Sequence, residues 1–198
     1  LDTQVASLSV LAMNYLTSGK IPGRFGNAHA NIVPYQVFKA RTGEFIIACG
    51  NDSQFGALCH SIGLAELAQD TRFIRNAGRV EHREVLTSIL QQHFMQHEAQ
   101  HWVNMIHAVN VPVGMINNLE QALQEEQVQA REMVVHMPHR LREDYQSIGS
   151  PIKLSKTPVE YKKAPPCLGE DTDQILAEFL TNDELEQLKV QGIIQQSA

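Results

Sequence analysis

Apolar residues recur at helical spacing at the start of the chain. The positions that share one face of a helix with 3.6 residues per turn are Leu1, Val5, Leu8, Ala12, Tyr15 and Leu16. The pattern predicts a helix that ends near Gly19, because glycine adopts the left-handed position after a helix without strain. The helix opens without Met, signal peptide or cap residue, so we expect the chain to be the later part of a longer protein.

The pattern changes from helical spacing to alternation after residue 34. Residues 20–34 contain two prolines and two glycines, a composition that predicts a linker. Residues 35–39 alternate, residues 44–50 are rich in β-formers, and the turn between them contains a glycine. These features predict a β-hairpin.

Helical spacing returns after the hairpin. Asn51 is a candidate cap for a helix that ends at Gly63, and a short helix is expected at 65–69. Asn76 is a candidate cap for a longer helix, and Trp102 lies in a further helix or in a continuation of the same one. We therefore expect residues 35–110 to form one compact unit of hairpin and helices.

From Val111 onward the pattern becomes more mixed. We expect an extended segment at 111–116, a helix at 119–124 capped by Asn118, and strands at 133–137 and 148–154. Closing helices should begin near Asp171 and Thr181. The second closing helix has the capping-box pattern Thr181-x-x-Glu184.

Composition narrows the possible functions. The chain of 198 residues is 43% apolar and 19% charged, which is typical of a globular protein. Its net charge of −6 argues against a nucleic-acid partner, and no apolar run is long enough to span a membrane. An odd number of well-separated cysteines disfavours a disulfide framework and fits a cytoplasmic location.

Local motifs supply little chemistry. His93, His97 and His101 would share one face of a continuous helix and could bind zinc, but the Glu of a His-Glu-x-x-His motif is missing. We therefore interpret them as a polar surface flank and expect no metal site. The chain also lacks a Gly-x-Ser-x-Gly elbow and a glycine-rich phosphate loop, so no catalytic residue is assigned.

Six segments in a fixed order carry a resemblance to a known family. They are LDTQVASL, RFGNAHANIVPYQVF, FIIACGNDSQF, NVPVGMINN, SPIKLS and APPCLGEDTDQIL. Together they resemble the second half of the class III CoA-transferases, the CaiB/BaiF family, across essentially all 198 residues. Within the family the chain is similar to the branch that includes succinyl-CoA–glutarate and formyl-CoA–oxalate transferases.

The resemblance implies an α/β fold in which part of a Rossmann-like large domain is joined to a smaller α+β domain, in an interlocked homodimer. Residues 1–19 would form a helix of the large domain, and residues 20–34 a linker and flap-like loop. Residues 35–110 would form the small domain, and residues 111–198 the segment that returns to the large domain.

The same resemblance implies an enzyme that moves CoA between carboxylic acids through covalent aspartyl intermediates. Its substrates would be an acyl-CoA and a carboxylic acid, with no cofactor other than the CoA of the substrate. In the family the nucleophilic aspartate and most CoA contacts lie in the first half of the protein, so we expect the 198-residue chain to be inactive alone. Two alternatives stay open, namely a racemase of α-methylacyl-CoA and a non-catalytic structural module.

The loop before the hairpin is the candidate binding site. In the formyl-CoA branch a glycine-rich flap at this position shields the active site, whereas this chain has His29-Ala30-Asn31-Ile32. The difference argues against oxalate and formate as substrates. The expected substrate-binding residues are Gly26, Asn27, His29 and Asn31. His29 and Asn31 either recognise the acyl group or acceptor carboxylate, or only stabilise the bend.

Overall fold

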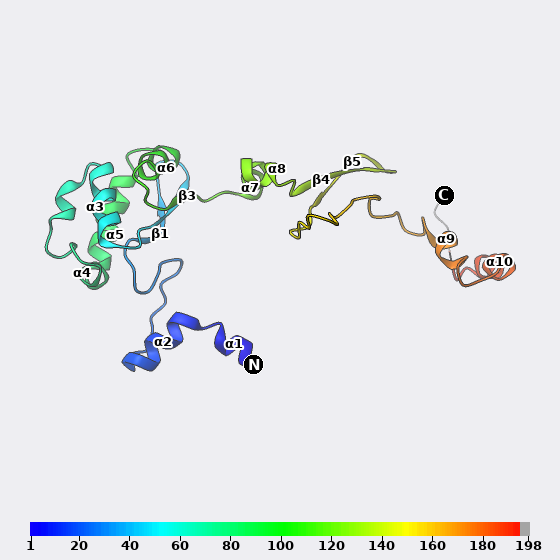
Figure 1. The fold of residues 1–198 in the computed structure, drawn as a ribbon, viewed down its shortest axis with the longest axis horizontal. Helices are drawn as coiled ribbons and strands as arrows, with labels where there is room; N and C mark the ends of the chain where they lie inside the picture. Colours follow the sequence, from blue (N-terminus) through cyan, green and yellow to red (C-terminus); the bar gives the residue numbers. More distant parts are fainter. Residues whose placement is uncertain (195–198) are drawn as a thin grey trace. The chain divides into compact units, whose positions relative to one another are not determined.

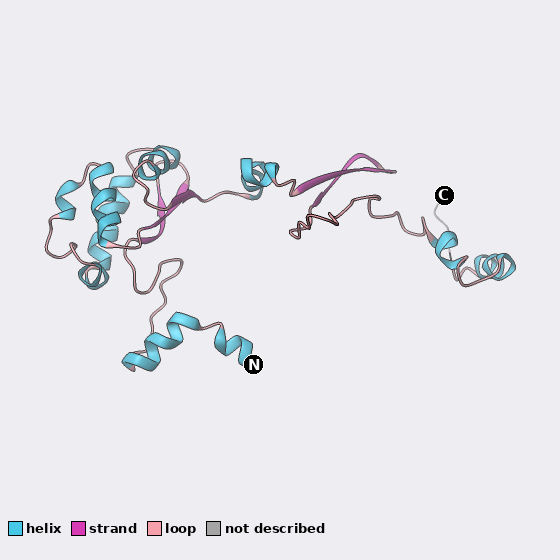
Figure 2. Ribbon diagram, in the orientation of Figure 1, coloured by secondary structure: helices cyan, strands magenta, loops and turns pink. Residues whose placement is uncertain are grey.

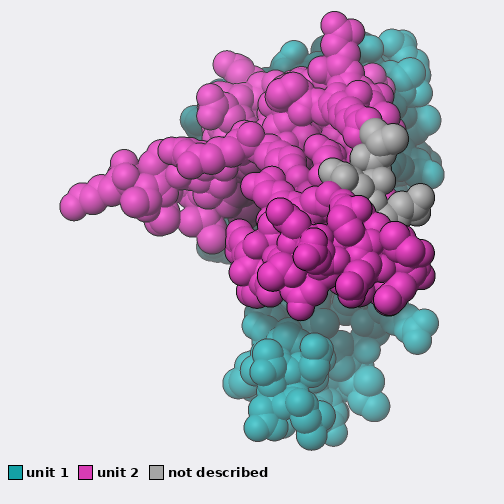
Figure 3. Space-filling model, turned by 90° about the vertical axis from the view of Figure 1, so that its right-hand side faces the viewer, with its two compact units in different colours: residues 1–116 teal, residues 117–198 magenta. Residues whose placement is uncertain are grey.

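The computed structural model is a mixed α/β fold with two small antiparallel sheets, and it describes residues 1–194 (Figure 1). The chain divides into two compact units, residues 1–116 and 117–198, which Figure 3 colours separately. Unit 1 contains α1 (Asp2–Ala6), α2 (Ser9–Ser18), β1 (Tyr35–Lys39), β2 (Glu44–Ala48), α3 (Asp52–Ser61), η1 (Ala65–Ala68), α4 (Asn76–Glu81), α5 (Arg83–Phe94), α6 (Ala99–His107) and β3 (Val113–Met115). Unit 2 contains α7 (Leu119–Gln124), α8 (Glu126–Ala130), β4 (Val134–His139), β5 (Arg142–Ile148), α9 (Thr172–Leu176) and α10 (Asn182–Val190).

The opening segment is two helices instead of the one that the sequence predicts. The helical path is interrupted at residues 7–8, and Ser9, the first residue of α2, has a positive φ of 44°. The predicted end is confirmed, because Gly19 adopts the left-handed conformation with a φ of 70°. Neither helix buries a residue within the described chain, so the predicted apolar stripe lies on its surface.

The predicted hairpin is confirmed and gains a third strand. β1 pairs antiparallel with β2, and both are among the strands drawn in magenta in Figure 2. The register places Phe38 opposite Phe45. The extended segment predicted at 111–116 contains β3, which pairs with the other edge of β2. The sheet order is therefore β1-β2-β3.

Helices α3, α5 and α6 supply the core that packs with this sheet. On each helix the later buried residues lie three, four, seven or eight positions after the first, as expected for one face of a helix. They are Phe55, Leu58 and Cys59 on α3, Leu86, Leu90 and Phe94 on α5, and Ala99, Trp102 and Ile106 on α6. The Phe94 ring meets Phe38 and Phe45 of the hairpin edge to face, with centroids 5.1 and 5.0 Å apart. The indole Nε1 of Trp102 donates to the carbonyl of Phe94 over 2.9 Å.

Most of the helices begin where the sequence predicts. The side chain of Asn51 caps α3 by accepting from the amide of Gln54, as predicted. Asn76 was expected to cap a long helix, and this prediction is wrong: Arg75 is the cap position, and Asn76 is the first residue of a short helix. The Asn76 side chain instead makes hydrogen bonds to residues 31 and 33, which are distant in sequence.

In unit 2, β4 forms a hairpin with β5, which pairs Val134 with Ile148. The strand predicted at 148–154 is wrong, because the partner strand ends at Ile148 and Pro151 cannot donate a ladder hydrogen bond. The capping box predicted at Thr181 forms, and Asn118 caps its helix as expected, also in a capping box, so both helices are confirmed. The four-part domain organisation implied by the family resemblance stays a prediction.

Candidate functional site

The loop between α2 and β1 (Figure 1) contains a tight turn at residues 25–28. The amide of Ala28 donates to the carbonyl of Phe25 over 3.0 Å, and Gly26 has a φ of 61°. A side chain at Gly26 would strain the backbone at this positive φ. The Oδ1 atom of Asn27 accepts from the amide of Val37 over 2.9 Å, so Asn27 attaches the turn to β1.

His29 is fixed by both its backbone and its ring. Its amide donates to the carbonyl of Tyr35 over 2.9 Å, and the two rings stack with centroids 5.3 Å apart. Its Nδ1 atom accepts from the amide of Asn31 over 3.0 Å. The neutral ring therefore carries its proton on Nε2. Within residues 1–194 this Nε2 makes no hydrogen bond, so it remains a donor for a ligand.

Asn31 is engaged on both its side chain and its backbone. Its side-chain amide exchanges two hydrogen bonds with that of Asn14 in α2, each 3.0 Å long. Its carbonyl accepts from Nδ2 of Asn76 over 2.7 Å. These contacts make Asn31 a bridge between α2, the loop and α4.

Three helix side chains hold the loop backbone, and the sequence interpretation missed all three. The amide Nδ2 of Asn76 holds the carbonyl of residue 31, the Nε of Arg79 donates to residue 33 over 2.7 Å, and Nη2 of Arg83 donates to residues 29 and 30 over 2.9 and 2.7 Å. We call Asn76, Arg79 and Arg83 the carbonyl clamp. The sequence shows that these residues lie three and four positions apart, but it does not show which segment they bind.

Arg79 is the buried centre of the clamp. Its side chain is 0% exposed and its guanidinium lies over the Phe55 ring, 4.5 Å from the centroid. Its Nη2 donates to Oδ1 of Asp52 over 2.9 Å, and Asp52 also pairs with Arg75. Desolvation of Asp52 opposes ionisation, but the hydrogen bonds from Arg79 and Arg75 outweigh it and lower the pKa of Asp52.

Arg83 holds the His29 end of the loop. Its guanidinium lies 5.1 Å from the centroid of the Phe25 ring, a cation–π arrangement. Burial lowers the pKa of Arg83, and its Nη1 atom is buried without a hydrogen-bond partner among the described residues. Arg83 thus joins the turn that contains Phe25 to the carbonyls of residues 29 and 30.

Two cavities open between the loop and α2. The first, of about 530 Å³, is lined by Val10, Leu11, Gly23, Arg24, Phe25, Gly26, Ala28, His29 and Ala30. The second, of about 540 Å³, is lined by Asn31 together with Asn14 and residues of the 17–23 segment. The four predicted site residues therefore separate: Gly26 and His29 line the first cavity, Asn31 lines the second, and Asn27 lines neither.

The three histidines of the sequence pattern do not share one helix. His93 lies on α5 and its Nε2 contacts the carbonyl of Ile62 at 2.8 Å, whereas His97 lies between helices and stacks on His101 of α6. Within residues 1–194, no three side chains of His, Cys, Asp or Glu are grouped as a metal site would require.

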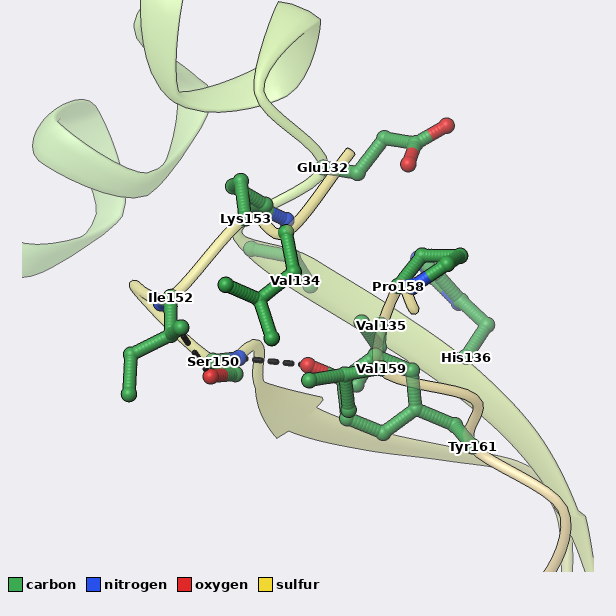
Figure 4. Close-up of a pocket in the computed structure, with 11 residues that line it drawn as sticks. Glu132, Val134, Val135, His136, Ser150, Ile152, Lys153, Pro158, Val159 and Tyr161 are labelled. Atoms are coloured by element: carbon green, nitrogen blue, oxygen red, sulfur yellow. Dashed lines mark hydrogen bonds between the residues drawn. The ribbon is translucent and has the colours of Figure 1, made fainter. Parts of the chain in front are cut away.

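Unit 2 contains a separate cavity of about 410 Å³, between β4 and the segment after β5 (Figure 4). Val134, Val135 and Val159 form apolar parts of its wall, and the hydroxyl of Tyr161 accepts from the amide of Ser150. These contacts attach the segment after β5 to the hairpin. None of the predicted site residues lies in this cavity.

None of the helices in residues 1–194 has the length and apolar character that crossing a membrane requires.

Comparison with known proteins gives one family. A family model described as CoA-transferase family III matches residues 1–172. The succinyl-CoA:glutarate CoA-transferase of Mus musculus is 36% identical over 198 residues, which cover 99% of this chain and 45% of that protein. The succinate–glutarate CoA-transferase of Agrobacterium fabrum is 38% identical over 181 residues, which cover 91% of this chain and 45% of that protein.

A solved structure agrees with these relatives. A CaiB/BaiF family protein from Brucella suis matches with a TM-score of 0.75 and 38% identity, over 87% of this chain and 44% of that chain. The chain therefore spans less than half the length of the relatives that it matches.

Proposed function

Because this chain belongs to CoA-transferase family III, we propose that the protein transfers coenzyme A from an acyl-CoA to a second carboxylic acid. Both relatives described above carry that activity in their names, for succinate and glutarate. The observation in the chain that supports the proposal is the clamped loop. It presents a fixed hydrogen-bond donor, His29 Nε2, at a cavity large enough for a small acid.

The proposed reaction uses an aspartate outside residues 1–198. Its carboxylate attacks the thioester carbonyl of the donor, and the CoA thiolate leaves as a mixed anhydride forms. The thiolate then attacks the aspartyl carbonyl and releases the donor acid, which leaves an aspartyl-CoA thioester. The acceptor carboxylate repeats these steps in reverse, so no water, metal or redox cofactor is needed.

In this scheme the loop positions the side chains that contact the substrate and protects the covalent intermediates from water. Water would hydrolyse the anhydride and waste the donor, so a cover over the covalent intermediates favours transfer. A loop held through its backbone carbonyls keeps its side chains in place during this stage. His29 then donates from Nε2 to an oxygen of the acyl group or of the acceptor acid.

The proposal extends to assembly and location. We place residues 1–19 and 111–198 in a Rossmann-like large domain and residues 35–110 in a small α+β domain, within an interlocked cytoplasmic homodimer. Exposed apolar residues of α1 and α2 support burial against another surface, since Val5 of α1 is 56% and Leu16 of α2 is 72% exposed. Light scattering of the full-length protein tests the dimer.

The direct test is CoA exchange by the full-length protein, with succinyl-CoA and glutarate as the substrates. Formation of glutaryl-CoA, followed by chromatography, is the expected result, and epimerisation of a 2-methylacyl-CoA without exchange would instead support a racemase. The isolated residues 1–198 should give no exchange. Replacement of His29→Ala should impair use of the acceptor, and unchanged acceptor kinetics would remove His29 from substrate recognition.

A further inference from the structure

The cavity beside His29 has walls of two kinds. Five of its lining residues are apolar, namely Val10 and Leu11 from α2, and Phe25, Ala28 and Ala30 from the loop. These walls suit a short hydrocarbon chain, because small-molecule sites are mainly apolar with a few placed polar groups.

Only two side chains with polar groups line this cavity among the described residues, and both can donate. His29 offers Nε2, because its Nδ1 is already an acceptor for the amide of Asn31. Arg24 lines the same cavity with an exposed guanidinium that forms no hydrogen bond or ion pair with residues 1–194. Among the described lining residues, none carries a carboxylate.

We propose that Arg24 and His29 form a subsite for the non-reacting carboxylate of a dicarboxylic acid, whose hydrocarbon chain lies against the apolar walls. Arginine suits this role because its planar fork of donors matches the two oxygens of a carboxylate. Arg24 would thereby determine specificity by selecting acids with two carboxylates over acids with one. This inference rests on the proposed CoA-transferase function and assigns to it the residues that recognise the second carboxylate.

A phosphate of coenzyme A is the other anion that such a reaction offers. The cavity favours the carboxylate, because it supplies a single cation beside five apolar residues. A multiply charged phosphate group usually recruits several cations or a row of backbone amides. Kinetics that vary the donor and the acceptor separately distinguish the two anions.

The test compares two five-carbon acceptors, glutarate and pentanoate, in the full-length enzyme. The variants are Arg24→Gln, Arg24→Lys and the control Arg41→Gln, which changes another exposed arginine of unit 1 that makes no side-chain hydrogen bond or ion pair among the described residues. Arg24→Gln should raise KM for glutarate about tenfold or more, because a charge-assisted hydrogen bond is lost. It should leave kcat and the KM for pentanoate within about twofold, and Arg24→Lys should restore part of the glutarate affinity.

A second measurement does not depend on turnover. In full-length protein labelled with ¹³C-histidine, glutarate should shift the His29 ring resonance, which is assigned by its loss in His29→Gln. Arg24→Gln should abolish the shift, and Arg41→Gln should keep it.

The outcomes separate the two proposals. If the wild-type enzyme exchanges CoA but Arg24→Gln keeps the glutarate-to-pentanoate preference, the subsite is refuted while the transferase function stands. A rise in the KM of the acyl-CoA donor alone would also refute it, in favour of a CoA phosphate. If the wild-type enzyme exchanges no CoA, the transferase proposal fails, and the glutarate titration still decides whether Arg24 and His29 bind a dicarboxylate.

Discussion

Replacement of Arg79 tests how unit 1 holds its loop. The Arg79 side chain is 0% exposed and donates to the carbonyl of Val33 over 2.7 Å, to the carbonyl of Phe73 over 2.8 Å and to Asp52 over 2.9 Å. The variant Arg79→Met keeps an unbranched side chain and removes every donor. We expect it to destabilise unit 1.

The size of the effect follows from the groups left without a partner. Each buried carbonyl that loses its donor costs about 1–3 kcal/mol, and Val33 and Phe73 are both 0% exposed. Asp52 adds little, because its side chain is 35% exposed and keeps hydrogen bonds from Arg75 and the amide of Asn76. Part of the loss is offset because methionine needs no hydrogen bonds in the interior. We therefore expect about 3 kcal/mol, or a melting temperature lower by about 6–12 °C.

The assay is urea unfolding followed by the fluorescence of Trp102, which is the one tryptophan of the sequence and is buried in unit 1. Arg75→Met is the matched control, because Arg75 pairs with the same carboxylate at 3.3 Å but is 81% exposed. An exposed ion pair contributes about 1 kcal/mol or less, so the control should unfold near the wild-type midpoint. If both variants lost the same small amount of unfolding free energy, the hydrogen bonds from Arg79 to buried carbonyls would not stabilise unit 1 as argued.

Three further predictions concern ionisation and capping. The pKa of Asp52 is lowered, so its ionised form stabilises the fold above the unfolded pKa of about 3.9, and this stabilisation is lost as the pH falls through the folded value. The variant Asp52→Asn should therefore flatten the decline of the urea midpoint below about pH 4. Burial raises the pKa of Cys49 to about 11 and of Cys59 to about 12, so at pH 8 iodoacetamide should modify the half-buried Cys167 first. Mass spectrometry measures the order, and equal rates of modification at the three cysteines would contradict it. Thr181→Ala removes the cap of α10 and should cost about 1 kcal/mol, detected as faster hydrogen exchange in that helix, while unchanged exchange would show that the cap is dispensable.

The elements that the sequence predicted well depend on neighbouring residues. The hairpin follows from alternation on both sides of a turn in which Gly43 adopts a φ of 81°, a conformation that glycine reaches freely. The caps at Asn51, Asn118 and Thr181 likewise involve residues three positions apart. Such contacts can be inferred from a short window of sequence.

The features that were missed depend on residues far apart. β3 joins the sheet by pairing Met115 with Phe45, and the alternation within residues 111–116 does not identify its partner. The hydrogen bond from Arg79 to Val33 joins residues 46 positions apart. Asparagine is a common helix cap, so the local pattern predicted a cap at Asn76. The structure shows instead that its side chain binds residues 31 and 33, which are distant in sequence.

The carbonyl clamp binds the backbone of the loop, so replacing the His29 side chain should leave the path of the loop unchanged. Asn76, Arg79 and Arg83 bind carbonyl oxygens of the loop, and every amino acid has a carbonyl. The path of the loop should therefore tolerate replacement of the His29 side chain, which contributes a stacked ring and one accepted hydrogen bond. A change of specificity at that position is thus largely separable from stability, whereas a change in the clamp affects both. Loss of acceptor recognition in His29→Ala without loss of fold would follow from this separation, and a large fall in its unfolding midpoint would contradict it.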